Sequence, residues 1–298
     1  MKGANITVKD LVRAYRLGKV EVQALRGLSM SVKESEVVAI IGPSGSGKTT
    51  LLNIVGGLDT ATAGTVTVGD LQVTALSPMQ LIDYRRTTVG HIFQTLNLIP
   101  TLTAAENIEL PMIALGTKGN ERKKRIHELL EIVGLTPRAD HKPDELSGGE
   151  QQRISMAAAL ANDAPIILAD EPTGELDTTN AKIVVEYLVK ISRDLGKTII
   201  MVTHDPNVAR HADRILRIED GIIKAAMTPA QILEPTAAIS YVDQLRSRVA
   251  DIDTQMEQLD KDYRAGKIDG DQYAEQRQRL KQAKTGLLDE LHRMGVVI

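Results

Sequence analysis

The chain has 298 residues, of which 42% are hydrophobic and 25% charged, and its formal net charge is −3. This composition fits one large globular domain, or one domain with an appendage, and the near-neutral charge does not indicate nucleic-acid binding or an anionic membrane surface. Cysteine is absent, which excludes disulfides, thiolate metal ligands and cysteine nucleophiles. No run of about 18 apolar residues could span a bilayer, and residues 1–10 lack the apolar core of a signal peptide, so we expect a cytosolic protein.

Residues 35–57 predict an apolar strand, a glycine- and serine-rich loop and an amphipathic helix. The loop at 42–49, GPSGSGKT, fits the phosphate-loop pattern G-x-x-x-x-G-K-[ST]. Backbone N–H groups of such a loop surround phosphate oxygens, and the helix N-terminus adds positive potential. Lys48 would contact the β and γ phosphates, and the Thr49 hydroxyl suits Mg²⁺. The predicted nucleotide-binding residues here are Gly42, Pro43, Ser44, Gly45, Ser46, Gly47, Lys48, Thr49 and Thr50.

The remaining elements predict an α/β fold. Residues 64–76 alternate in hydrophobicity and predict two short antiparallel strands. A helical pattern fills the region from about 95 to 160. Residues 164–172 and 197–205 are continuous apolar runs that end in acidic or histidine residues, which is typical of strands buried in a parallel sheet with chemistry at their carboxyl ends. Residues 212–225 predict a closing hairpin.

Four side chains at these strand ends are candidate catalytic or metal-binding residues. A phosphate-loop ATPase needs one carboxylate near Mg²⁺ and another near the attacking water, and we assign Asp170 to the metal and Glu171 to the general base. Pro172 favours an extended Glu171 that points into the site. Gln94 follows an apolar strand and either contacts Mg²⁺ or the water, or is an ordinary loop residue. His204 ends a third buried strand, within reach of a γ-phosphate, although a lone histidine is more often structural.

Residues 146–150, LSGGE, resemble the signature motif of the ATP-binding-cassette (ABC) ATPases. Five further motifs of that family occur here: the phosphate loop, Gln94, the acidic pair at 170–171, GELD at 174–177, and His204. The resemblance covers residues 1 to about 225. It implies a P-loop NTPase domain with a RecA-like parallel sheet core, an antiparallel β-subdomain and a helical signature subdomain at about 95–160.

The resemblance also implies that two chains pack head to tail, so that each signature contacts the γ-phosphate bound to the other chain. The N–H groups of a helix that starts with two glycines form an anion site, although Ser-Gly-Gly is also a plain helix cap. Tyr15 would stack on adenine, and Asp177 would lie at the dimer seam. Glu175 stands where close relatives often carry Asn, which puts in doubt how tightly that loop couples the two sites. The implied signature residues are Ser147, Gly148, Gly149 and Glu150.

Within the family, residues 15–30, 101–112 and 171–177 resemble the MacB, LolD and FtsE types. This implies a homodimer at the cytoplasmic face of the membrane that binds ATP and Mg²⁺ and powers a separate, MacB- or FtsX-like permease for export, extraction or mechanotransmission. We expect no nucleic-acid partner.

Three alternatives remain. The chain could be the ATPase of a nutrient importer, a non-transport ABC protein of DNA repair, chromosome maintenance or translation, or a catalytically idle docking scaffold. About 100 residues separate the phosphate loop from the signature, too few for the coiled coils of repair types, and a single phosphate loop differs from the two of translation types.

From about residue 226 the sheet pattern stops, and residues 226–298 predict a C-terminal helical extension. A first apolar series with three- and four-residue steps is broken at 265–272, and a second, weaker series follows. We predict a helical hairpin or short coiled coil that serves as a packing or dimer-stabilising appendage. The two series are Val242, Leu245, Val249, Ile252, Met256, Leu259 and Tyr263, and then Tyr273, Leu280, Leu287 and Leu291.

Overall fold

The computed structural model describes residues 2–17, 20–174, 176–233, 252, 255–256, 259–260, 263 and 270–293. The chain divides into two compact units, residues 1–233 and 234–298. Every residue predicted for the active site belongs to the first unit. No helix among the described residues combines the length and hydrophobicity that crossing a membrane requires.

A six-stranded sheet in the order β10-β9-β3-β8-β7-β6 forms the centre of the first unit. Its strands run parallel except β10, which pairs antiparallel with β9. All six residues of β8 are buried, which explains why the sequence of this strand is a continuous apolar run rather than an alternating one. The predicted parallel sheet and closing hairpin are confirmed. The strands are β3 (Val37–Ile41), β6 (Val89–Ile92), β7 (Ile166–Asp170), β8 (Thr198–Thr203), β9 (Arg214–Glu219) and β10 (Ile222–Met227).

A second, antiparallel sheet has the order β2-β1-β4-β5. Its longest pair, β1 and β2, lies within residues 6–32 and carries Tyr15 opposite Val22. The two short strands predicted at 64–76 are present, but the second is only two residues long and leads into a 3₁₀ turn, η1 (Val73–Ala75). The strands are β1 (Ile6–Leu17), β2 (Val20–Val32), β4 (Ala63–Val68) and β5 (Leu71–Gln72).

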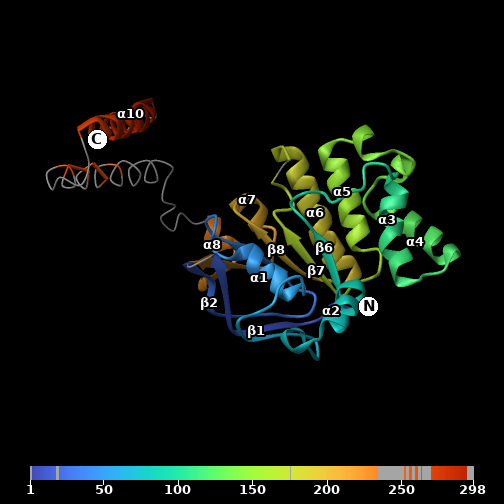
Figure 1. Cartoon of the computed structure of the whole chain (residues 1–298). Coiled ribbons are helices and arrows are strands. Elements are labelled where there is room, and N and C mark those ends of the chain that lie inside the picture. The colour runs from blue at the N-terminus through green and yellow to red at the C-terminus, as the bar shows by residue number, and fades with distance from the viewer. Residues whose placement is uncertain are drawn as a thin grey trace. The chain divides into compact units, whose positions relative to one another are not determined.

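Helices cover both faces of the central sheet (Figure 1). Alternate residues of β3 enter two separate cores: Val37 and Ala39 pack with α3 to α7, whereas Val38 and Ile40 pack with α1, α2 and the antiparallel sheet. The helices α3, α4 and α5, drawn in green, form the helical subdomain. The helices are α1 (Lys48–Val55), α2 (Pro78–Thr87), α3 (Ala104–Leu115), α4 (Gly119–Ile132), α5 (Gly148–Ala159), α6 (Thr178–Leu195), α7 (Pro206–Ala209) and α8 (Pro229–Leu233), with 3₁₀ turns η2 (Thr136–Arg138) and η3 (Pro143–Glu145).

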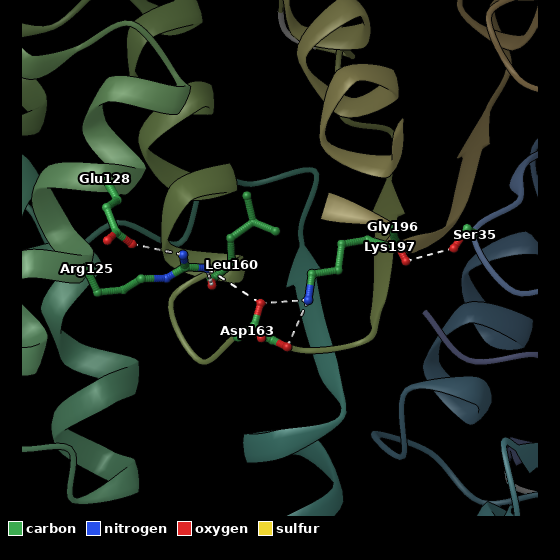
Figure 2. Close-up of polar contacts among 7 residues, drawn as sticks. All are labelled: Ser35, Arg125, Glu128, Leu160, Asp163, Gly196 and Lys197. Carbon is green, nitrogen blue, oxygen red and sulfur yellow. Dashed lines mark hydrogen bonds and ion pairs between the residues drawn. The ribbon is translucent and has the colours of Figure 1, made fainter. Parts of the chain in front are cut away.

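A polar cluster connects the turn between α5 and β7 to the helix α4 on one side and to Lys197, which precedes β8, on the other (Figure 2). Lys197, which has no exposed surface, donates to the Asp163 carboxylate at 2.7 Å and to its backbone carbonyl at 3.0 Å. Arg125 of α4 donates to the Leu160 carbonyl at 3.0 Å and lies 3.8 Å from the same carboxylate. The turn therefore joins the helical subdomain to the central sheet between the signature helix α5 and the strand β7 that ends at Asp170.

In the second unit, α10 (Gly270–Arg293) contacts two described residues that precede it, Asp260 and Tyr263. The rings of Tyr263 and Tyr273 stack with centroids 4.3 Å apart, and the Tyr273 phenol donates to Asp260 at 2.7 Å. These contacts join residues close together in the sequence, and the helical hairpin or coiled coil stays a prediction. Three heptad positions, Val242, Leu245 and Val249, lie outside the described residues, as does Glu175 in the first unit.

Candidate active site

The phosphate loop connects the carboxyl end of β3 to the start of α1. Gly45 and Gly47 adopt positive φ angles of 78° and 101°. A Cβ atom at position 47 would lie 2.5 Å from the Ala24 carbonyl oxygen, so the packing of this loop against β2 requires glycine there. The close approach explains the glycine in the motif and adds Ala24, which the sequence did not predict, to the site.

Lys48, the first residue of α1, folds back over the loop. Its ammonium donates to the carbonyl oxygens of Gly42 at 2.9 Å and Pro43 at 3.0 Å, and only 8% of the residue is exposed. A positive charge and the N-terminus of an eight-residue helix thus meet at one point. This arrangement favours a bound polyphosphate.

A cavity of about 370 Å³ opens over the loop and brings together nine of the predicted residues. They come from four places in the chain: the loop with α1, the segment after β6, the end of β7 and the end of β8. A larger cleft of about 600 Å³, between α6 and the residues after α7, contains none of the predicted residues. The residues that line the 370 Å³ cavity are Ala24, Ser44, Gly45, Gly47, Lys48, Thr49, Thr50, Gln94, Glu171 and His204.

Two oxygen groups beside this cavity, the Thr49 hydroxyl and the Asp170 carboxylate, could serve as ligands of a hard divalent cation. The Thr49 hydroxyl donates to the Asp170 carboxylate at 3.3 Å. Burial raises the pKa of Asp170, although the hydrogen bond from Thr49 and the charge of Lys48 oppose the rise. Hydroxyl and carboxylate oxygens are the ligands that Mg²⁺ prefers, so the residues present fit the predicted metal.

Glu171 and His204 form a direct pair at the ends of adjacent strands. The Nδ1 atom of His204 lies 3.0 Å from Oε2 of Glu171, and the glutamate side chain is 13% exposed whereas the histidine side chain is 71% exposed. The predicted extended conformation of Glu171 is wrong: its φ is +45°. Its N–H donates to Val202 and its carbonyl accepts from Gly174, both at 3.0 Å, so a tight turn outweighs the preference imposed by Pro172.

Gln94 connects this cavity to the start of the signature helix. It lines the 370 Å³ cavity and also a small adjoining cavity of about 50 Å³, which Gly148 and Glu171 line as well. The side chain therefore lies between the phosphate loop and the helical subdomain.

The signature begins α5 with its side chains turned to local partners. Ser147 accepts a hydrogen bond from the Glu150 N–H, and the Glu150 carboxylate accepts from the Ser147 N–H at 2.9 Å, which forms a capping box. The hydrogen bonds that the carboxylate accepts, from the Ser147 N–H and from the Ser147 hydroxyl at 2.8 Å, lower the pKa of Glu150. Ser147 and Gly148 are exposed, while a Cβ atom on the buried Gly149 would lie 2.5 Å from the Asn180 side chain. None of these described residues lines the 370 Å³ cavity of the same chain.

Asp177 caps α6 next to the signature. One carboxylate oxygen accepts from the N–H groups of Thr179 and Asn180, each at 2.9 Å, and the other accepts from the Asn180 side chain at 2.7 Å. These bonds, led by the one from the Asn180 N–H, lower the pKa of Asp177. Asn180 therefore contacts both the predicted seam residue and Gly149.

Tyr15 lies on β1, beside α1 and outside the cavity lining. Its phenol oxygen is 3.4 Å from the Thr50 hydroxyl, and Thr50 does line the cavity. The ring is half-buried. Tyr15 therefore contacts a residue of α1 that lines the cavity.

Residues 25–174 match the sequence profile of the family described as ABC transporter. An uncharacterized ABC transporter ATP-binding protein of Methanocaldococcus jannaschii, MJ0796, is 46% identical over 223 residues, which cover 74% of this chain and 95% of the relative. The macrolide export ATP-binding/permease protein MacB of Brucella abortus is 43% identical over 247 residues, or 83% of this chain and 38% of that protein. A solved dimeric, post-hydrolysis state of the cassette MJ0796 bound to ADP and Pi matches with a TM-score of 0.70 and 43% identity, covering 75% of this chain and 98% of that chain.

The solved cassette shares the α/β architecture described above. The predicted P-loop NTPase fold and the prediction of an ATPase are both confirmed. The chain belongs to the ABC transporter family and is an ATP-binding cassette that hydrolyses ATP, with MacB- and LolD-like relatives.

Proposed function

We propose that two copies of this chain pack head to tail and hold ATP between the phosphate loop of one copy and the signature of the other. The observation that carries this proposal is the position of the signature: Ser147 and Gly148 are exposed at a helix start and lie outside the cavity of their own chain. A helix N-terminus that starts with two glycines is an anion site that needs a phosphate from elsewhere. The solved cassette MJ0796 is itself described as dimeric.

Within each site, we assign the chemistry to the residues gathered at the strand ends. Glu171 accepts the proton of the attacking water, and His204 orients that carboxylate from 3.0 Å. Lys48 neutralises charge on the β and γ phosphates, and Gln94 senses the occupied site. Thr49 and Asp170, with Gln94, would hold Mg²⁺. When bound, Mg²⁺ offsets the charge on the phosphate oxygens.

We further propose that the cassette works at the cytoplasmic face of the membrane with a separate permease of the MacB or FtsX type. The Brucella relative is named as an ATP-binding and permease protein in one chain, and this chain matches 38% of it. A groove of about 370 Å³ lies between β6, α3 and α5, and Phe93 and Leu96 beside Gln94 contribute to its lining. A partner seated in this groove would contact the segment that carries Gln94, which supports docking on the helical subdomain.

The test separates ATP binding, dimer closure and hydrolysis. Glu171→Gln keeps the shape of the side chain but cannot accept the proton, so this variant should bind ATP, hydrolyse it at least about 100-fold more slowly and accumulate as a dimer in light scattering. Adding Ser147→Arg should return it to a monomer that still binds ATP, because the phosphate loop is intact. Normal turnover of Glu171→Gln would exclude Glu171 as the base, and loss of ATP binding in the double variant would argue against a signature that acts on the other chain.

A further inference from the structure

Arg13, Tyr15 and Asp59 form a polar cluster beside the phosphate loop. The Tyr15 phenol donates to one Asp59 carboxylate oxygen at 2.7 Å, and the Arg13 guanidinium donates to the other at 2.6 Å. The guanidinium carbon also lies 4.5 Å from the centroid of the Tyr15 ring. The side chains of Arg13 and Asp59 are each 20% exposed, so this ion pair is partly shielded from water.

Asp59 is anchored to the helix that starts at the phosphate loop. The N–H groups of Leu58 and Asp59 both donate to the Asn53 carbonyl of α1, at 2.8 and 3.2 Å. The carboxylate that holds the phenol therefore moves with α1, whose other end carries Lys48. The helix α1 therefore connects the phosphate loop to the carboxylate that accepts from the Tyr15 phenol.

The cluster also leaves only one face of the Tyr15 ring available for stacking. Arg13 covers one face, so a planar base can stack only on the opposite face. The bond to Asp59 fixes the position of the phenol and so removes much of the rotational freedom that stacking would otherwise have to restrict. Asp59 does this without lining the cavity itself.

We propose that Asp59, together with Arg13, is a positioning residue that orients Tyr15 to receive the base of the nucleotide. The inference rests on the proposed function in that it takes Tyr15 as the residue that stacks on adenine. Asp59 acts only through the base, so it contributes to the affinity for ATP and not to the affinity for the phosphates.

The experiment compares ATP with inorganic tripolyphosphate, which has the phosphates but no base. Calorimetric titration of the full chain with Mg²⁺ should show that Asp59→Ala weakens ATP binding about 3- to 10-fold and leaves tripolyphosphate binding unchanged. Tyr15→Phe, which keeps the ring but loses the phenol, should weaken ATP binding to a similar extent. Asp59→Asn retains one acceptor oxygen and should recover part of the loss. Asp70→Asn, an exposed carboxylate in the turn between β4 and β5, controls for the removed charge.

A double variant decides whether Asp59 acts through Tyr15. Asp59→Ala combined with Tyr15→Phe should bind ATP no more weakly than either single variant. Additive losses, an equal loss of tripolyphosphate binding, or unchanged ATP binding in Asp59→Ala would each overturn the inference. Tyr15→Ala with wild-type ATP affinity would overturn the stacking itself. If the unmodified chain bound neither ligand, the proposed function would fail, which is a separate outcome.

Discussion

His91 lies on β6, and its environment makes the stability of the fold sensitive to pH. The ring stacks on Phe93 with centroids 5.2 Å apart, and its Nε2 atom is buried without a hydrogen-bond partner among the described residues. Burial lowers the pKa of His91 to about 4, with a further contribution from the charge of Arg85, while the neighbouring Gly56 backbone opposes the shift. The folded protein therefore holds a neutral imidazole.

Between about pH 6.5 and pH 4 the unfolded chain binds a proton at His91 and the folded chain does not. The free energy of unfolding should therefore fall as the pH is lowered through this range, by at most about 1.4 kcal/mol per pH unit for this residue. Urea unfolding at several pH values should show a flatter dependence for His91→Gln, and the exposed control His127→Gln should retain the original slope. An identical slope in His91→Gln and the unmodified chain would exclude this contribution.

Sequence patterns predict which residues at strand ends belong to the site. They do not predict residues whose place in the site depends on contacts between distant parts of the chain. Glu171 and His204 could be placed in one site because parallel strands of a sheet end at the same edge. Asp59 and Ala24 have no such signal, since their roles depend on how the antiparallel sheet packs against α1. The conformation of Glu171 was predicted wrongly because a local turn overrides the influence of Pro172.

Among the elements, the turn between α5 and β7 links the helix that starts at the signature to the strand that ends at Asp170. Asp163 in this turn contacts Lys197 and Arg125. The hydrogen bond from Lys197 lowers the pKa of Asp163 against the opposing effect of its partial burial. Asp163 also has a φ of +55°, a conformation that Asp and Asn tolerate better than most residues.

Asp163→Asn keeps this backbone preference but removes the negative charge beside the buried ammonium of Lys197. We expect the free energy of unfolding to fall by about 1 to 3 kcal/mol, less than for a fully buried pair because the Asp163 side chain is 46% exposed. Lys197→Met in the same background should recover part of the loss, since an apolar side chain then occupies the buried position. Urea denaturation measures both; an Asp163→Asn variant as stable as the unmodified chain would show that the charge pair contributes little.

Elements buried on both faces are the ones that the sequence predicts best. β7 and β8 are continuous apolar runs because helices or strands cover both faces. The helix α2 has a single buried residue, Tyr84, and therefore lacks the apolar periodicity that predicts a helix. The long β1 and β2 hairpin was not predicted either, because three register shifts interrupt its alternation.

At the scale of the whole molecule, the first compact unit extends to Leu233, whereas the sequence predicts that the ATPase domain ends at about residue 225. The sheet pattern in the sequence stops at about residue 226, but β10 continues to Met227, which pairs with Ile215, and α8 continues to Leu233. We therefore propose that the independent unit ends at Leu233, where the contacts divide.

A chain that ends at Leu233 should fold and hydrolyse ATP. Its melting temperature by circular dichroism should stay within about 5 °C of the full chain, because the core of the first unit remains complete. ATPase activity at high protein concentration should stay within about a factor of two. An aggregated or unfolded product would show that the helical extension contributes to the core.

The central claim is that the signature of one chain meets the phosphate loop of another, and the absence of native cysteine allows a direct measurement. Two singly substituted chains, one with Ser44→Cys and one with Ser147→Cys, both in the Glu171→Gln background, are mixed and treated with a short bismaleimide. With ATP we predict a covalent dimer in which mass spectrometry finds peptides carrying positions 44 and 147 joined, and without ATP little or none. A mixture that binds ATP yet never joins these two positions would contradict the account.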